Sequence, residues 1–203
     1  MTTSTTTPAR LDLRFVEAAE PVQEPITKFG GQPVWIDEPA WPLSAEFGRP
    51  MRFLGQIRMP GDQVRLAYLF ITEEFDEDDV VDTFEPRGGE NAFFAQPGAP
   101  ADCYQVAGIR KGPTFGPDHT AELAPHPDAG GEDDVDDFAS RLWGVPRWLQ
   151  GEEVPDDPGT WRFVLQLDST EDLPFDVNFG DGGVGYAFLD EKTGQGRFLW
   201  QCE

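Results

Sequence analysis

Residues 31–36 read Gly-Gln-Pro-Val-Trp-Ile, and residues 144–149 read Gly-Val-Pro-Arg-Trp-Leu. In both stretches the glycine tolerates a positive φ and the proline fixes φ at about −65°, so each predicts a turn that enters a short extended segment. The tryptophans, Trp35 and Trp148, are large apolar side chains suited to anchoring such a turn to a core. The recurrence of the motif indicates two copies of one structural unit.

Two further blocks repeat in the same order. Residues 52–57 (Arg-Phe-Leu-Gly-Gln-Ile) match residues 162–167 (Arg-Phe-Val-Leu-Gln-Leu), and residues 68–71 match residues 186–189. Because the matches keep their order along the chain, they predict an internal duplication.

The composition predicts the organisation around these blocks. We expect a disordered, Thr-rich tail at residues 1–9 and a single domain at residues 10–203. Within the domain, the two halves are predicted to span about residues 25–111 and 135–203. An acidic, Pro- and Gly-rich loop at residues 112–134 would connect them.

Short aromatic and alternating segments bounded by Gly, Asp or Pro predict a largely antiparallel β protein. A short helix is expected at 134–142, where apolar residues recur at helical spacing, and a weaker one at 10–20. The predicted fold class is therefore α+β, mainly antiparallel β with few short helices. The predicted strands are 52–57, 64–71, 103–109, 162–167, 184–190 and 196–202.

The chain is strongly acidic, with 38 Asp and Glu against 15 Lys and Arg and a formal net charge of −23. This charge predicts that nucleic acid is not a partner, because phosphate binding requires basic residues. Two explanations stay open. The acidity serves solubility, or it forms a surface for a basic protein or peptide.

Other features predict the compartment. No run approaches the roughly 20 apolar residues of a membrane span, and the first residues lack the apolar centre of a signal peptide. We therefore expect a cytoplasmic protein without a membrane partner. Cys103 and Cys202 are predicted to be reduced, partly buried thiols, since they show no disulfide or metal-ligand pattern.

The sequence offers few catalytic groups. Its two histidines, His119 and His126, fall in the predicted connecting loop, where an exposed position is expected. The carboxylate runs at 76–79 and 132–137 lack the alternating layout of a calcium loop and are predicted to be solvated. We therefore predict no catalytic residue, no metal site and no cofactor.

Candidate binding residues come from the repeated blocks. The tryptophans either line a groove or fill the core. The repeated glutamines either bind a ligand or hydrogen-bond to backbone as buried amides. The aspartate of the Gly-Asp-Gly-Gly segment at 180–183 either reaches a ligand or forms a β-turn. The candidates are Trp35, Trp41, Gln56, Trp148, Gln166 and Asp181.

Residues 28–35, the Trp41-Pro42 pair and residues 50–57 together resemble the opening of the YwqG-like family, a bacterial domain of unknown function. Residues 142–150 and 180–188 are similar to its second half, except that Trp143 stands where the family often has a glycine. The resemblance implies a compact α+β domain of repeated β units, with no established activity. A weaker similarity links the turn motif to programmed cell death protein 2-like proteins, which are chaperones of a basic ribosomal protein.

These observations favour a non-enzymatic protein-interaction module that binds a basic partner, either chaperone-like or of the immunity type. The alternative is a small-molecule-binding protein or an unrecognised hydrolase with its site between the two halves. An enzyme should gather titratable groups with perturbed pKa values in that cleft. A binding module should instead show an acidic or aromatic patch on an open face.

Overall fold

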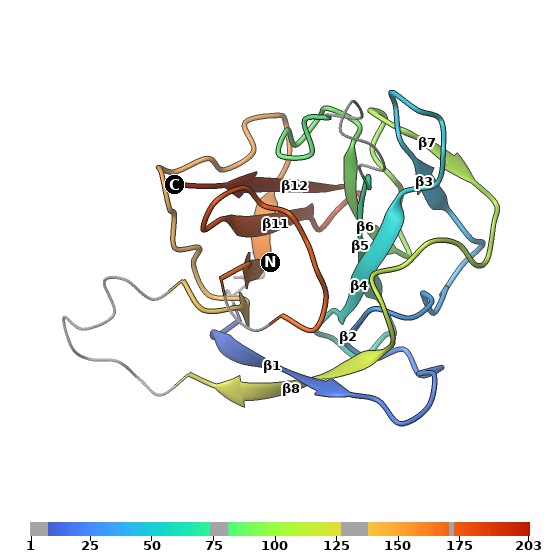
Figure 1. Cartoon of the computed structure of the whole chain (residues 1–203), viewed down its shortest axis with the longest axis horizontal. Coiled ribbons are helices and arrows are strands. Elements are labelled where there is room, and N and C mark those ends of the chain that lie inside the picture. The colour runs from blue at the N-terminus through green and yellow to red at the C-terminus, as the bar shows by residue number, and fades with distance from the viewer. Residues whose placement is uncertain (1–7, 74–80, 127–137, 171–172) are drawn as a thin grey trace, which may run out of the picture.

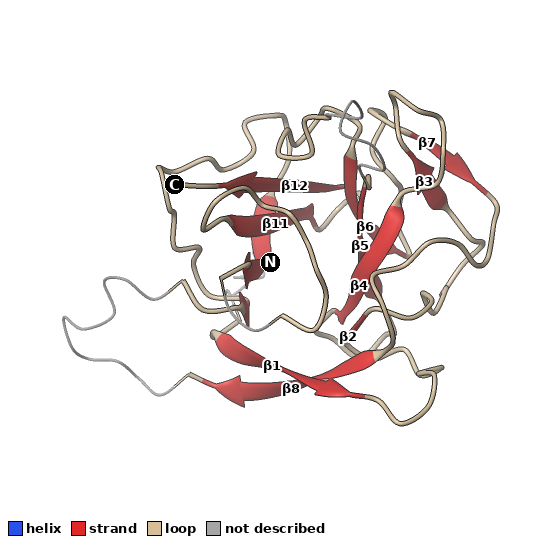
Figure 2. Ribbon diagram, in the orientation of Figure 1, coloured by secondary structure: helices blue, strands red, loops and turns tan. Residues whose placement is uncertain are grey.

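The computed structural model of the chain describes residues 8–73, 81–126, 138–170 and 173–203. The regular elements in these residues are β-strands, and the described part of the chain contains no helix (Figure 2). The fold is all-β, which corrects the α+β class expected from the sequence. The strands are β1 (Leu11–Glu17), β2 (Lys28–Phe29), β3 (Trp41–Leu43), β4 (Arg52–Arg58), β5 (Leu66–Ile71), β6 (Asn91–Gln96), β7 (Gln105–Ala107), β8 (His119–Pro125), β9 (Arg141–Leu142), β10 (Trp161–Asp168), β11 (Val184–Asp190) and β12 (Gly196–Gln201).

Ten of the strands form one antiparallel sheet in the order β12-β11-β10-β9-β1-β8-β2-β4-β5-β6. The two edges of this sheet come together, because the Ala95 N–H donates to the Gly194 carbonyl at 2.8 Å and Phe94 forms a bridge with Gln195. The sheet is therefore nearly closed and barrel-like (Figure 1). A two-stranded sheet, β3-β7, lies outside β4, β5 and β6.

The strand order places two similar sets of strands on either side of a central pair. β2, β4, β5 and β6 follow one another on one side, and β9, β10, β11 and β12 do so on the other. The central pair is exchanged between the halves: β1 pairs with β8 and with β9, whereas β8 pairs with β1 and with β2. When the chain is divided after residue 111, the first half supplies β1 to the strands of the second, and the second half supplies β8 to the strands of the first.

Two local expectations from the sequence are wrong. The segment at 10–20, expected to be helical, forms β1, because Leu11, Leu13 and Phe15 alternate and pack against the core from one face. The segment at 112–134, expected to be a loop, contains β8, so His119 lies buried at the start of a strand.

The helix expected at 134–142 is not found where the structure describes that segment. Residues 138–140 have no regular structure and residues 141–142 form β9. Residues 134–137 lie outside the described residues, as do the tail at 1–7 and the acidic runs at 76–79 and 132–137. The described residues 138–142 are too few to form the predicted amphipathic helix. Residues 141–142 pair with β1 and β10, and this pairing determines their conformation.

The core has an inner part and two outer parts. In β5 the side chains of Ala67, Leu69 and Ile71 point into the inner cluster, which both halves share. The alternate residues, such as Tyr68 and Phe70, belong to an outer cluster that β3 and β7 cover. A smaller outer cluster lies on the equivalent face of the second half.

Trp143 shows how one departure from the resembled family is accommodated. Its φ is 63°, close to the 67° of Gly30, and its N–H donates to the Val164 carbonyl at 3.0 Å as that of Gly30 donates to Leu54 at 2.8 Å. A left-handed backbone costs a residue with a side chain roughly 1–2 kcal/mol. The indole is only 3% exposed in the inner cluster, so its burial offsets this cost.

Candidate functional site

A buried glutamine fixes each Gly-x-Pro-x-Trp turn. The Gln56 amide oxygen accepts from the Val34 N–H at 2.9 Å, and its amide nitrogen donates to the Ile26 carbonyl at 3.0 Å. The Gln166 amide makes the same pair of bonds, with the Arg147 N–H at 2.9 Å and the Phe138 carbonyl at 2.7 Å. Both glutamines are fully buried, so these two candidates position the turns and do not present an amide to solvent.

A tyrosine supports the same turn in each half. The Tyr68 hydroxyl accepts from the Ile36 N–H at 3.2 Å, and the Tyr186 hydroxyl accepts from the Leu149 N–H at 3.0 Å. Burial raises the pKa of Tyr186 to about 12, so this hydroxyl stays protonated at neutral pH. It can therefore act as donor and acceptor at once.

A third pair of residues also holds the turns, and sequence reasoning did not identify it. The Gln96 amide oxygen accepts from the Asp37 N–H at 3.2 Å, and that of Gln201 accepts from the Gln150 N–H at 3.0 Å. These glutamines follow their tyrosines by 28 and 15 residues (96 − 68 and 201 − 186), so a fixed spacing could not reveal them. The only sequence signal is that each ends a strand.

Trp35 and Trp148 occupy equivalent, half-buried positions. Trp35 stacks on Phe70 with ring centroids 6.2 Å apart and planes 15° apart, and Trp148 stacks on Phe188 at 5.8 Å and 11°. One side of each indole is therefore in contact with the sheet. The occupant of the space beside this stack differs between the two halves.

In the first half the space beside this stack is filled by Trp41. This indole is fully buried, with its centroid 6.1 Å from that of Trp35 and 5.2 Å from that of Phe70. Its N–H donates to the Met51 carbonyl at 2.8 Å. Trp41 is therefore a core residue, in agreement with one of the two readings left open by the sequence.

In the second half the corresponding space is open. Six residues after Trp148, the spacing that separates Trp41 from Trp35, the chain has Val154, which is 43% exposed. A hollow of about 580 Å³ lies here, within the range typical of ligand sites. We call it the second-half hollow. Its aromatic and aliphatic walls include Trp148, Val154, Trp161, Phe163 and Phe188.

A groove of about 440 Å³ lies beside Trp35 in the first half, lined in part by Pro33, Arg110 and Asp118. Behind it, the buried Lys28 ammonium contacts the Asp118 carboxylate and donates to the Gln32 carbonyl at 2.6 Å. Burial lowers the pKa of Lys28, while the hydrogen bond and charge of Asp118 act against that change. The ion pair is internal and holds the turn, so we assign it a structural role.

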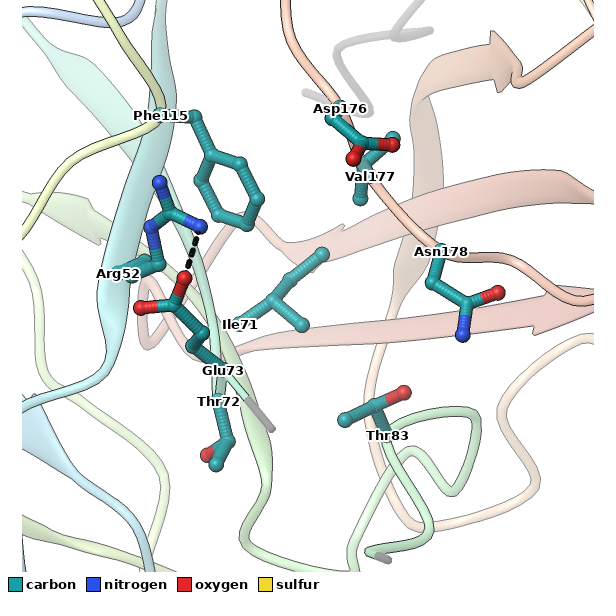
Figure 3. Close-up of a pocket in the computed structure, with 9 residues that line it drawn as sticks. All are labelled: Arg52, Ile71, Thr72, Glu73, Thr83, Phe115, Asp176, Val177 and Asn178. Atoms are coloured by element: carbon teal, nitrogen blue, oxygen red, sulfur yellow. Dashed lines mark hydrogen bonds and ion pairs between the residues drawn. The ribbon is translucent and has the colours of Figure 1, made fainter. Parts of the chain in front are cut away.

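A third pocket, of about 270 Å³, lies between the two halves (Figure 3). Arg52 on one side forms an ion pair with Glu73, and its guanidinium lies 4.2 Å from the ring centroid of Phe115. Asp176 and Asn178 face them from the segment between β10 and β11. The described lining residues include no histidine, cysteine or serine.

The remaining candidates lie elsewhere. Asp181 is exposed in the turn before β11, where its carbonyl accepts from the Glu203 N–H at 2.9 Å, and it does not line the second-half hollow. The His126 ring lies 2.8 Å from the Asp12 carboxylate at the end of β8. Cys103 and Cys202 are half-buried and not disulfide-bonded. Within the described ranges, no group of three or more His, Cys, Asp and Glu side chains is arranged to hold a metal ion.

Across residues 8–73, 81–126, 138–170 and 173–203, no helix has the length and apolar character needed to cross a bilayer. No protein-family model matches the chain, and no curated protein matches its sequence.

Proposed function

We propose that this protein is a non-enzymatic protein-interaction module that binds a basic segment of another protein, in a chaperone-like or immunity-type role. The observation that carries the proposal is an open aromatic hollow on the surface of a chain with a net charge of −23. Aromatic pockets bordered by charge are typical of protein recognition sites, where anchors such as Trp dominate the binding energy.

The charge around the second-half hollow supports a basic partner. Glu152, Glu153 and Asp156 are exposed in the segment that borders it. The nearby Arg162 is already paired with Glu191 at 2.9 Å, which leaves the exposed carboxylates as the dominant charges of this segment. A lysine or arginine brought to this edge would find complementary charge.

The alternative is a small-molecule site or hydrolase between the halves, and the pocket of Figure 3 is its position. That pocket is the smallest of the three hollows, and its arginine is neutralised by Glu73. The side chains whose pKa is shifted by burial, such as Lys28 and Tyr104, lie outside it. These features favour the interaction module.

We also propose membership of the YwqG-like family, from the ordered sequence blocks, and a cytoplasmic location, from the two free thiols. Neither nucleic acid nor a membrane surface is proposed as a partner, because the net negative charge would oppose binding to phosphates and to anionic lipids.

The proposal is tested with two labelled peptides that are identical except that one carries lysines where the other carries glutamates. We expect the lysine peptide to bind, and its affinity to fall at least about tenfold between roughly 0.1 M and 1 M salt, since the Debye length falls from about 10 Å to about 3 Å. Fluorescence anisotropy gives both dissociation constants. Preferential binding of the glutamate peptide, or affinity independent of salt, would refute the proposal.

A charge-matched pair of variants locates the binding surface. Neutralising Glu152, Glu153 and Asp156 should weaken binding of the lysine peptide more than neutralising three exposed acidic residues of the first half does. Those control residues are Glu17, Glu20 and Glu24. Equal effects of the two variants would show that the charge acts through the whole molecule and not at the hollow.

A further inference from the structure

Building on the proposed function, we propose that the second-half hollow binds an aromatic side chain of an extended basic segment from a partner protein. The aromatic side chain would take the position that Trp41 occupies in the first half. The chain thus contains, in its own first half, a filled copy of the site that is open in its second half.

The walls of the two sites correspond. Trp35 and Trp148 lie in equivalent turns, held by Gln56 and Gln166 through the same pair of hydrogen bonds. Beneath them, Phe53 contacts Phe70 at 5.3 Å and 59°, and Phe163 contacts Phe188 at 5.7 Å and 61°. The β-bulges also match, falling between Phe53 and Gly55 in β4 and between Phe163 and Leu165 in β10.

The occupants differ. Trp41 is fully buried against Trp35 and Phe70, whereas Val154 at the same spacing is 43% exposed and lines an open hollow. Val145, on the same rim, is 77% exposed. An aromatic side chain buries roughly 150–250 Å². An indole bound in the second-half hollow would therefore remove from water the aromatic walls that correspond to those covered by Trp41 in the first half.

The negative charge of the chain indicates which molecule provides the aromatic side chain. The four stretches outside the described residues contain no lysine or arginine, many acids and a single aromatic residue, Phe75. A second copy of the chain brings a charge of −23 toward the same charge. The acidic stretch that contains Phe75 and a second copy of the chain would both be repelled by the exposed Glu152, Glu153 and Asp156. A basic segment of a different protein fits the charge of the rim.

The first half also indicates the conformation of the bound segment. Trp41 enters its site from the extended strand β3, and Pro42 follows it. A proline cannot donate a ladder hydrogen bond, which suits a strand laid at an edge. We therefore expect an extended segment with an aromatic residue, flanked by lysine or arginine.

The probe is the peptide Lys-Lys-Pro-Ala-Trp-Pro-Leu-Lys, which copies residues 39–43 between lysines. It is compared by calorimetry with a peptide that has alanine for tryptophan and with one that has glutamate for lysine. We expect the loss of tryptophan to weaken binding at least about tenfold, as truncation of an interface anchor does. Val154→Trp, which fills the hollow from within, should abolish that difference. Val106→Trp, at a residue 44% exposed on β7, should preserve it.

A second measurement holds even if Val154→Trp fails to fold. In the wild-type protein the indole N–H resonances of Trp148 and Trp161 should shift when the tryptophan probe is added and stay in place with the alanine probe. Unchanged resonances would overturn the inference.

The outcomes separate the two proposals. Equal binding of the lysine peptides with tryptophan and with alanine overturns the aromatic site and leaves the basic-partner function standing. Equal binding of the tryptophan peptides with lysine and with glutamate overturns the basic-partner function and leaves the aromatic site standing. If none of the peptides binds, the aromatic site is overturned.

Discussion

Buried polar side chains hold the two Gly-x-Pro-x-Trp turns in place. Each turn lies across the outer face of the sheet, where its backbone groups would lack partners if the side chains beneath it were apolar. Side-chain amides supply a donor and an acceptor together, which suits a turn that exposes both an N–H and a carbonyl. The three equivalent pairs are Gln56 and Gln166, Tyr68 and Tyr186, and Gln96 and Gln201.

Replacing Gln56 with leucine should destabilise the protein by roughly 2–4 kcal/mol, because the Val34 N–H and the Ile26 carbonyl would lose their partners. Urea unfolding measures the change in the free energy of unfolding. Gln63→Leu, at an exposed glutamine, serves as the control and should change stability by less than about 0.5 kcal/mol. Equal effects of the two variants would show that the buried amide does not stabilise the turn.

Asp190 predicts a pH-dependent contribution to stability. Burial raises the pKa of its carboxyl, but hydrogen bonds from the Thr193 hydroxyl, at 2.7 Å, and from backbone N–H groups, including that of Thr160 at 3.1 Å, outweigh burial and lower it below 3.8. A carboxyl whose pKa is lower in the folded state than in the unfolded state stabilises the fold at pH values above its unfolded pKa. This contribution is lost as the pH falls through the folded pKa.

The variant Asp190→Asn should therefore be less stable than wild type by about 1 kcal/mol at neutral pH. The difference should shrink as the pH falls below 3.8, the ordinary pKa of the group. Urea unfolding at a series of pH values gives the two curves, and Asp181→Asn, at an exposed carboxylate, is the control. A difference that stays constant into acid would mean that the ionised carboxylate is not what stabilises the folded state.

The sequence identified residues whose spacing repeats and missed those whose role depends on distant partners. Trp35, Trp148, Gln56 and Gln166 were found because their blocks recur, and the structure places them in corresponding positions. The importance of Val154 could not be recognised from the sequence. It matters because the second half has no tryptophan at the position that corresponds to Trp41 of the first half.

At the scale of elements, the exchanged strands β1 and β8 tie the halves together. Each was misread from the sequence for a different reason. In β1 the residues Leu11 and Phe15 fit both a helical and an alternating pattern, and Leu13 decides for the strand. β8 is half exposed and lies within a Pro- and Gly-rich segment, and its pairing with β1 and β2 makes it a strand. The strongly apolar β5, β10 and β11 were predicted because burial on both faces leaves a clear sequence signal.

This exchange predicts how fragments behave. A chain cut between Lys111 and Gly112 separates β1 from both of its neighbours and β8 from both of its neighbours. Fragments 1–111 and 112–203 should each be largely unfolded alone and should regain β structure when mixed, as followed by circular dichroism. A control cut after His126 leaves β1, β8 and β2 in one fragment, which should retain more structure. Independent folding of 112–203 would contradict the importance of the exchange.

At the scale of the whole molecule, the two halves share an interior and differ on the outside. The inner cluster joins them, so the sheet nearly closes around one core. Outside, the first half is covered by its own β3-β7 pair, and the second half keeps an open aromatic hollow beside exposed carboxylates. The two similar sets of strands supply a stable frame, and the absence of a covering tryptophan in the second half leaves the proposed binding site open.

The most direct measurement of this account is a crystal structure of the protein with the lysine- and tryptophan-containing probe. The account predicts that the probe's indole lies in the second-half hollow, against Trp148 and Phe188 and beside Val154, with its lysines toward the exposed carboxylates of the bordering segment. An empty hollow with the probe bound elsewhere on the molecule would contradict it.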